Sequence, residues 1–270
     1  MDLTGLNKDQ LSAVTRVEGP LLILAGAGSG KTRVITYRIA HMIEDLKISP
    51  YSILAITFTN KAAKEMKERV NALIGDRAKD MWISTFHSLC VRILRRDIER
   101  IGYNRSFVIY DTQDQLSLIK ECIKECGLRE DSFKPSSVLS AISGAKDKLL
   151  NPKAFEDRYF NDFRLSKISK VYDLYQRKLK SNNALDFDDL IFKTVELLKT
   201  DEFVRDFYQR KFQYVMVDEY QDTNQIQESL IALIAQYQEP FIPLFMVGDM
   251  KQSIYRFRQA DPSIFQHKFD

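Results

Sequence analysis

The stretch that most constrains the fold of this chain is residues 19–32, which read GPLLILAGAGSGKT. The apolar run 21–24 predicts a short buried strand, and the small residues that follow it predict a tight loop. From Lys31 onward, apolar residues recur at helical spacing, so a helix is expected to begin where the loop ends. A strand, a glycine-rich loop, Lys-Thr and a helix form an arrangement that holds the phosphates of a nucleoside triphosphate.

Each residue type in this loop has a physical reason to be there. Glycines let backbone N–H groups curl around phosphates, and the helix that follows points its positive N-terminus at them. Lys31 would reach the β- and γ-phosphates, and the Thr32 hydroxyl would bind Mg²⁺. The general pattern has glycine at position 25, where this chain has Ala25, and the bland alternative is a turn that binds nothing. The predicted nucleotide-binding residues here are Gly26, Ala27, Gly28, Ser29, Gly30, Lys31, Thr32 and Arg33.

A second segment, VMVDEYQDT at 215–223, supplies what hydrolysis needs. An aspartate at the end of a buried strand can hold Mg²⁺ through water, and an adjacent glutamate can orient and deprotonate the attacking water. Asp218 takes the first role and Glu219 the second. Lys31, Asp218 and Glu219 are therefore predicted catalytic residues, and Thr32 and Asp218 predicted metal ligands. The alternative is that the two acids only cap a helix.

The composition indicates the cellular compartment of the protein more clearly than it indicates a binding partner. With 40 basic against 37 acidic residues the net charge is +3, so any DNA-binding prediction must rest on local groups. The three cysteines show no C-x-x-C spacing, which favours reduced thiols. No signal-peptide core and no apolar run of membrane-spanning length are present, so we expect a cytoplasmic protein without a membrane partner.

Further strand patterns at 53–56, 82–84, 214–217 and 244–247 alternate with helical patterns and predict an α/β fold. This alternation favours a parallel sheet flanked by helices, with functional loops at the carboxyl ends of the strands. From about residue 111 to 181 strand patterns vanish and helical spacing takes over. The predicted organisation is one α/β domain in two parts, 1–110 and 185–270, with an all-helical inserted subdomain at 111–184.

Seven segments in order carry a resemblance to a known family: LNKDQ (6–10), GAGSGKT (26–32), TFTNKAAKEM (57–66), STFHS (84–88), LDFDDLI (185–191), DEYQDT (218–223) and VGDMKQSIYRFR (247–258). Together they resemble the motifs of superfamily-1 DNA helicases of the UvrD/Rep/PcrA family, over essentially the whole chain. The resemblance implies the first RecA-like P-loop NTPase domain of an ATP-dependent helicase or translocase. Such an enzyme uses ATP and Mg²⁺, moves 3′ to 5′ on single-stranded DNA and unwinds duplex DNA in repair or replication.

The resemblance also implies roles for individual residues. Gln10 would contact adenine, although the local sequence fits a capping box with Asn7 equally well. Gln252 would act in catalysis by sensing the γ-phosphate. Aromatic faces suit single-stranded DNA because every base can stack on them, whereas a lone aromatic is more often part of a core, and His87 could be a bystander. The implied DNA contacts are Thr57, Phe58, Thr59, Asn60, His87, Phe187, Tyr255, Phe257 and Arg258.

Some features depart from the family pattern. Phe257 stands where many relatives carry tryptophan, and Met250, Lys251 and the run after Arg258 are similar to AddA-type helicase–nuclease subunits. The sequence ends at Asp270 without the second RecA-like domain and its arginine finger. We therefore expect weak nucleotide binding, very slow turnover and no unwinding from residues 1–270 alone. The competing hypotheses are a non-catalytic nucleotide- and DNA-binding module and a P-loop kinase.

Overall fold

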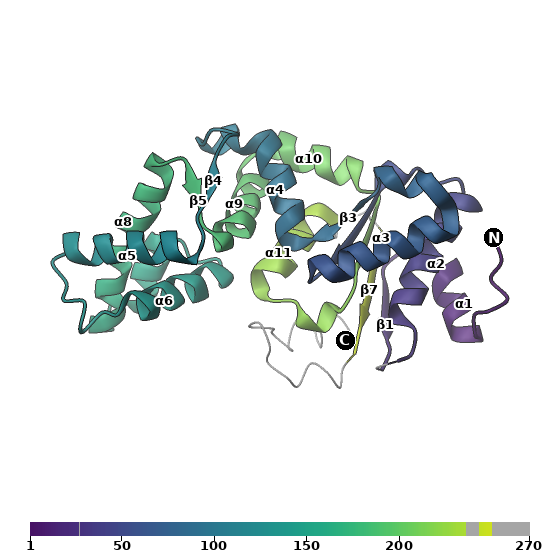
Figure 1. Ribbon diagram of the computed structural model, residues 1–270, viewed down its shortest axis with the longest axis horizontal. Coiled ribbons are helices and arrows are strands. Elements are labelled where there is room, and N and C mark those ends of the chain that lie inside the picture. Colours follow the sequence, from purple (N-terminus) through teal and green to yellow (C-terminus); the bar gives the residue numbers. More distant parts are fainter. Residues whose placement is uncertain (27, 236–242, 250–270) are drawn as a thin grey trace. The chain divides into compact units, whose positions relative to one another are not determined.

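The computed structural model describes residues 1–26, 28–235 and 243–249 (Figure 1). Five residues predicted for the site, Ala27, Gln252, Tyr255, Phe257 and Arg258, lie outside the described residues. The chain divides into two compact units. The first joins Met1–Leu89 to the chain from Asp201 onward, and the second is Cys90–Thr200.

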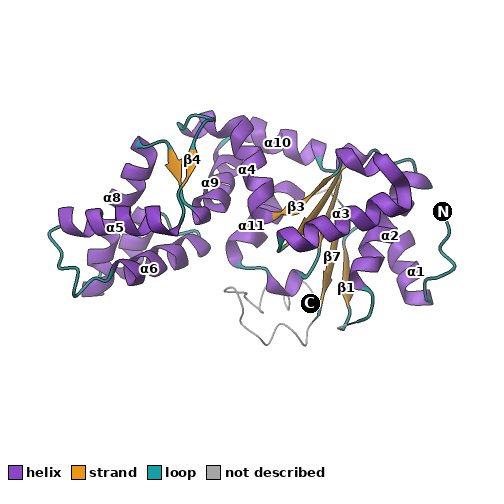
Figure 2. Cartoon of the chain, in the orientation of Figure 1, coloured by secondary structure: helices purple, strands orange, loops and turns teal. Residues whose placement is uncertain are grey.

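The first unit is built on a parallel sheet flanked by helices (Figure 2), which confirms the predicted fold class. In the described part of the chain the sheet has five strands in the order β1-β7-β6-β2-β3. The strands are β1 Leu21–Leu24, β2 Ile53–Thr57, β3 Trp82–Thr85, β6 Tyr214–Val217 and β7 Leu244–Gly248. The helices of this unit are α1 Lys8–Thr15, α2 Lys31–Glu44, α3 Asn60–Ile74, α10 Glu202–Lys211 and α11 Gln225–Ala235.

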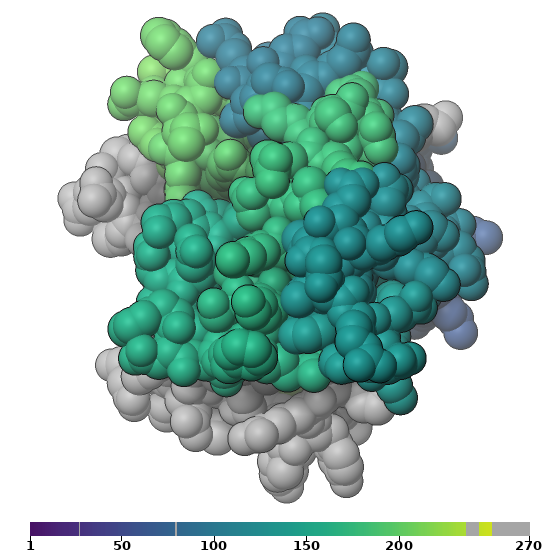
Figure 3. Space-filling model, turned by 90° about the vertical axis from the view of Figure 1, so that its left-hand side faces the viewer, coloured from purple at the N-terminus to yellow at the C-terminus, as the bar shows by residue number. Residues whose placement is uncertain are grey.

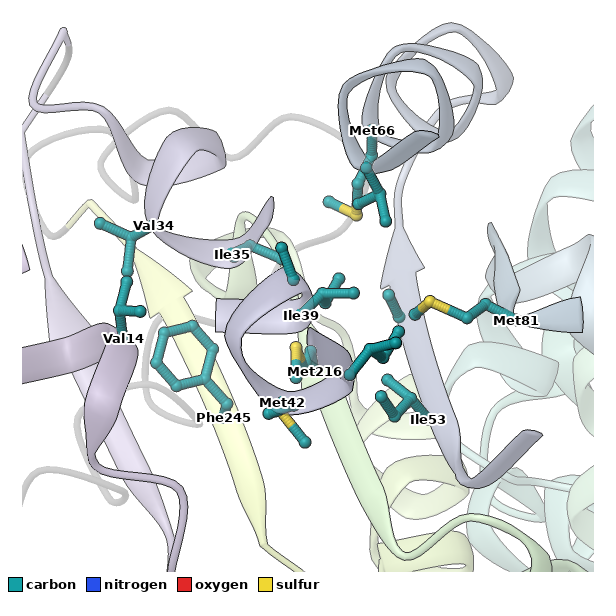
Figure 4. Close-up of a cluster of buried hydrophobic side chains, with 14 of the residues drawn as sticks. Val14, Val34, Ile35, Ile39, Met42, Ile53, Met66, Met81, Met216 and Phe245 are labelled. Atoms are coloured by element: carbon teal, nitrogen blue, oxygen red, sulfur yellow. The ribbon is translucent and has the colours of Figure 1, made fainter. Parts of the chain in front are cut away.

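The core of this unit explains why the strand sequences are almost entirely apolar. All five residues of β2 are buried, as a parallel strand covered on both faces requires. Ile53 of β2 belongs to one hydrophobic cluster with side chains of α1, α2 and α3, and side chains alternate between the two faces of a strand. Figure 4 shows Ile39 of α2 beside Met216 of β6, and Val14 of α1 against Val34 of α2.

The order of the strands determines which loops meet at the carboxyl edge of the sheet. Strand β1 pairs with β7 so that Leu24 lies beside Gly248, and β7 pairs with β6 so that Met246 lies beside Val217. The loops that follow β1, β6 and β7 therefore emerge side by side. This edge receives the glycine-rich loop and the acidic pair.

The second unit is helical apart from one short parallel pair of strands, β4 Val108–Ile109 and β5 Ala184–Leu185. Its helices are α5 Thr112–Glu125, α6 Pro135–Asp147, α7 Pro152–Tyr159, α8 Phe163–Ser181 and α9 Phe187–Thr200, and α4 Phe86–Asp97 leads into it from the first unit. Atoms of this unit form the teal and green surface in Figure 3. Pro135 and Pro152 each occupy the first position of a helix, where a missing N–H costs nothing, so both prolines mark helix boundaries.

Two helices are shorter than the sequence pattern indicates. The sequence pattern predicts a helix over 5–17, whereas α1 runs from Lys8 to Thr15. It also predicts a helix over 86–100, whereas α4 ends at Asp97 and the chain continues as a 3-10 turn at Ile98–Ile101. The compact helical unit, Cys90–Thr200, extends past the range 111–184 at both ends. Within the described ranges, no helix is both long enough and apolar enough to span a membrane.

Candidate nucleotide site

The glycine-rich loop has backbone geometry that only glycine adopts easily. Gly28 has φ +75° and Gly30 has φ +86°, both in the left-handed region. Gly30 is the residue before α2 and offers no side chain to cap the first N–H groups of that helix. These groups, together with the helix dipole, form an N-terminus of the kind that binds anions.

An ion pair joins the loop to the acidic segment after β6. The Lys31 ammonium lies 3.1 Å from Oε2 of Glu219, and the Lys31 side chain is only 8% exposed. The two residues lie far apart in the sequence, and the sheet brings them together because β1 and β6 are both neighbours of β7. The structure therefore unites the predicted phosphate-binding cation with the predicted base.

Asp218 lies at the end of β6, where its N–H donates to the carbonyl of Ile56 at 3.0 Å. Burial, reinforced by the neighbouring Glu219 carboxylate, raises the pKa of Asp218 to about 6, against the opposing effects of the Glu219 N–H and Lys31. A carboxylate in this setting is ionised more readily when a cation lies beside it. Asp218 at the end of β6 and Thr32 in the first turn of α2 both carry side-chain oxygens, the type of ligand that Mg²⁺ binds.

In the described part of the chain, no group of three or more His, Cys, Asp or Glu side chains could hold a metal ion by itself. A cation held by one or two protein oxygens with substrate phosphates and water is the usual Mg²⁺ arrangement at phosphate-transfer sites. The residues present fit that arrangement better than a site made only of protein ligands.

The alternative that the two acids merely cap a helix is wrong. Glu219 has a left-handed backbone with φ +50°, and Tyr220–Asp222 form a 3-10 turn after it. The next helix, α11, is instead capped by Asn224, whose side chain accepts from the Gln227 N–H at 3.1 Å. A non-glycine residue in the left-handed region is uncommon and is found preferentially at functional sites.

Gln10 is held by contacts at both ends of its amide. Its Oε1 accepts from the Asn7 N–H at 3.1 Å, which confirms the capping box, and its Nε2 donates to the carbonyl of Ser29 at 3.0 Å. A Cβ atom at Gly30 would lie 3.0 Å from this Nε2, a tight contact that the end of the Gln10 side chain would have to relieve by shifting, so the positive φ is the reason for glycine there. The adenine contact of Gln10 stays a prediction.

Two arginines of α2 fasten the N-terminal segment beside the loop. Arg33 donates to the carbonyl of Gly5 at 3.0 Å. Arg38, buried at 1% exposure, donates to the carbonyl of Ala13 at 2.7 Å and also to that of Arg16, and burial lowers its pKa to about 10. Sequence reasoning missed Arg38. The only signal was a charge on the otherwise apolar face of the helix.

A hollow of about 260 Å³ lies next to the acidic pair. It joins residues from the TFTN segment to the acidic segment, and its lining consists of Thr57, Phe58, Thr59, Ala62, Asp218, Glu219 and Asp222. Thr57 is buried and donates to the carbonyl of Thr59, whose own hydroxyl caps α3 by accepting from Ala62 N–H at 3.1 Å. The two threonine side chains therefore shape this loop.

The other residues predicted to contact DNA differ in exposure. Phe58 is half-buried, with its ring 5.3 Å from that of Phe86 in an edge-on contact. Asn60 is exposed as the first residue of α3, and His87 is half-buried near the start of α4. Phe187, in the second unit, is 53% exposed at the first residue of α9.

Comparison with known proteins agrees with this geometry. A sequence model of the family described as "UvrD/REP helicase N-terminal domain" matches residues 6–270. The chain is 55% identical over 259 residues to the protein named ATP-dependent DNA helicase PcrA of Bacillus subtilis, covering 96% of this chain and 34% of that protein. It is 51% identical over 259 residues to the protein of the same name in Staphylococcus aureus, covering 96% of this chain and 35% of that one.

The chain therefore spans about a third of the length of the curated relatives that it matches. The family model covers nearly all of its residues, including every segment on which the resemblance rests. The Lys31–Glu219 ion pair joins the glycine-rich loop to the acidic pair at one edge of the sheet. This chain belongs to the UvrD/REP helicase N-terminal domain family.

Proposed function

We propose that this chain is the N-terminal, ATP- and DNA-binding portion of an ATP-dependent DNA helicase that moves along single-stranded DNA. The observation that carries the proposal is the 3.1 Å ion pair between Lys31 and Glu219, at the mouth of a loop suited to phosphates. Movement from 3′ to 5′ and a role in unwinding duplex DNA for repair or replication rest on the family resemblance alone. A cytoplasmic setting is supported by the three free cysteines.

In this proposal the α2 N-terminus and the loop glycines bind the β- and γ-phosphates of ATP, and Lys31 moves its charge from Glu219 to the phosphate oxygens. Thr32 and Asp218 would hold Mg²⁺, which neutralises charge on the β- and γ-phosphates when bound. Glu219, released from Lys31, accepts a proton from the attacking water. Gln252 would sense the γ-phosphate, and Gln10 and Arg33 would contact the adenine side of the nucleotide.

DNA binding is proposed for residues on both sides of the hollow and beyond it. Phe58 and Thr59 line the same hollow as Glu219, so a strand held by the TFTN segment would lie close to the proposed hydrolytic residues. We propose that a second RecA-like domain supplies an arginine across the nucleotide, a group worth about 10³–10⁵ in rate in phosphoryl transfer. Residues 1–270 alone would then hydrolyse ATP very slowly.

Lys31→Ala is the direct test of the phosphate loop. We expect weaker ATP binding by residues 1–270 and loss of ATPase activity in the complete helicase, because the charge aimed at the β- and γ-phosphates is gone. Titration calorimetry and a steady-state ATPase assay measure the two effects. Lys64→Ala, which removes an exposed lysine that pairs with Glu68 on α3, is the matched control and should change neither. Normal ATPase rates in Lys31→Ala would show that the loop assignment is wrong.

Phe187→Ala tests the DNA contact in the second unit. If a base stacks on this exposed ring, its removal weakens single-strand affinity by about 1–3 kcal/mol, with little effect on ATP binding or stability. Fluorescence anisotropy of a labelled oligonucleotide measures the affinity. Phe203→Ala, which removes an 81% exposed ring on α10, is the control and should leave the affinity unchanged. Equal losses in both variants would argue against a specific stacking site.

The alternatives give different results in the same assays. ATP turnover that single-stranded DNA does not stimulate would favour a P-loop kinase. Nucleotide binding without turnover in the complete protein would favour a non-catalytic binding module. Stimulation of turnover by DNA, together with strand displacement, would support the helicase.

A further inference from the structure

Gln221 is a buried amide that connects two of the loops at the carboxyl edge of the sheet. It lies in the 3-10 turn after Glu219 and is 1% exposed. Its Nε2 donates to Oε2 of Glu219 at 2.7 Å. Its Oε1 accepts from the backbone N–H of Asp249 at 3.0 Å. Asp249 is the residue directly after β7, so the side chain bridges the β6 and β7 loops.

The chemistry of this bridge calls for an amide. The bridge needs a donor at one end, facing a carboxylate, and an acceptor at the other, facing an N–H group, and a glutamine side chain has both. A carboxylate at this position would keep the acceptor and lose the donor. A thioether of similar length would lose the donor and offer only a weak acceptor.

Gln221 and Lys31 share the same oxygen of Glu219. Oε2 lies 3.1 Å from the Lys31 ammonium and 2.7 Å from the Gln221 amide. If Lys31 turns to the phosphates of a bound nucleotide, Gln221 remains as the group that holds the carboxylate. Among the described residues, Asp218, which precedes Glu219, and Asp222 are further charged groups that line the same hollow.

We propose that Gln221 is a positioning residue for ATP hydrolysis. It holds the Glu219 carboxylate where that group can take a proton from the attacking water, and it connects the carboxylate to Asp249 at the end of β7. The backbone N–H of Asp249 is thereby linked to the Glu219 carboxylate through the two hydrogen bonds of the Gln221 side chain. This inference rests on the proposed ATPase function of Glu219.

The test is a double-mutant cycle in the complete helicase, with Gln221→Met and Glu219→Gln. Gln221→Met alone should lower kcat by about 10–100-fold, the size of effect seen when a catalytic group is misplaced by about 1 Å. The Kd for ATP should change by less than about twofold, since Gln221 is not among the groups that would bind phosphate. Added to Glu219→Gln, the same change should lower kcat no further, because Gln221 acts through the base that is already gone.

Gln221→Glu tests the two hydrogen bonds of the bridge separately. It also keeps the proposal testable if Gln221→Met does not fold. It keeps an acceptor for the Asp249 N–H but presents a carboxylate to Glu219, so kcat should fall while hydrogen exchange of the Asp249 amide stays slow. In Gln221→Met that exchange should become faster. Gln209→Met is the matched control, because this amide donates to the carbonyl of Leu233 in the same unit at 2.8 Å, and kcat should not change.

Several outcomes would overturn the inference. One is that Gln221→Met leaves kcat unchanged while the wild-type enzyme is active. Another is that Gln221→Met lowers kcat in the Glu219→Gln background by the same factor as in the wild-type background. A rapidly exchanging Asp249 amide in the unmodified protein would also contradict the bridge, and it needs no variant. Failure of the proposed function is distinguishable, because the wild-type protein would then lack DNA-stimulated ATPase activity altogether.

Discussion

Glu219→Gln is expected to lower the ATPase rate of the complete helicase by about 10²–10⁴-fold, while ATP and Mg²⁺ still bind. The substitution keeps the length of the side chain and an oxygen that can accept from Gln221, which now lies 2.7 Å from the carboxylate. It removes the group that takes the proton from water. It also removes the ion pair with Lys31, so the lysine is freer to meet the phosphates and affinity for ATP should not fall.

Single-turnover hydrolysis and a separate nucleotide-binding titration measure the two expectations. Glu68→Gln is the matched control, because this exposed glutamate pairs with Lys64 on the surface of α3. If Glu219→Gln lost nucleotide binding, Glu219 would have a structural role in the site. An unchanged rate would show that another group activates the water.

Lys146→Met should lower the free energy of unfolding by about 3–5 kcal/mol at neutral pH, the cost of leaving buried charge without its partner. The Lys146 side chain is fully buried in the second unit, with its ammonium 2.6 Å from Asp186 and 2.9 Å from Asp189. Tyr175 also donates to Asp186 at 3.0 Å. These groups fasten α6 to the turn between β5 and α9, and Phe187 stands at that turn.

The loss of stability should depend on pH in a defined direction. Burial raises the pKa of Asp186 to about 6, with Asp189 adding to the rise and Lys146 opposing it. Without the ammonium the folded-state pKa of Asp186 rises further above the unfolded value of about 3.9, so the folded variant takes up a proton that the unfolded chain does not. The penalty relative to the wild type is therefore full above the raised pKa of the variant and shrinks as the pH falls toward 6, below which Asp186 is protonated in both folded proteins.

Denaturant titrations of residues 1–270 at pH 8 and pH 5 measure this difference. Lys153→Met is the control, because it removes an exposed lysine of the same unit that pairs with Glu156 and Asp157. Such surface pairs contribute only about 0–1 kcal/mol. A penalty of the same size at both pH values would contradict the assignment of the cost to unpaired buried carboxylates.

The local sequence was sufficient for the sheet, and it singled out residues that the sheet brings together at its carboxyl edge. The strands at 21–24 and 214–217 are unbroken apolar runs, and 214–217 is mostly buried, as a parallel strand covered on both faces requires. The strand at 21–24 is only half-buried, with Leu24 exposed, because β1 lies at the edge of the sheet in the described residues. Gly28 and Gly30 stand where the backbone takes positive φ, and Lys31 follows them at the start of a helix. These signals lie within a few residues of one another, so they can be read without knowing the fold.

The inserted helices were predictable as helices but not as a unit with defined ends. Periodicity indicates which residues of a helix are apolar, and it does not indicate which other helix they meet. The parallel pair of Val108–Ile109 with Ala184–Leu185 is two residues long in each strand. No pattern of alternation can form over so short a length, so sequence reasoning did not find these strands.

Tertiary structure alone decided the partners of the buried polar groups. Arg38 with the carbonyl of Ala13, Lys146 with Asp186, and Gln221 with Asp249 are each separated by 25 residues or more. A buried charge or amide is stable only when a complementary atom lies within hydrogen-bond distance. Which atom that is depends on how the strands are ordered and how the helices cross, and neither is written in any local stretch of the chain. The residues that could bind ATP were therefore evident from the sequence, and the residues that hold them in place emerged only once the chain was folded.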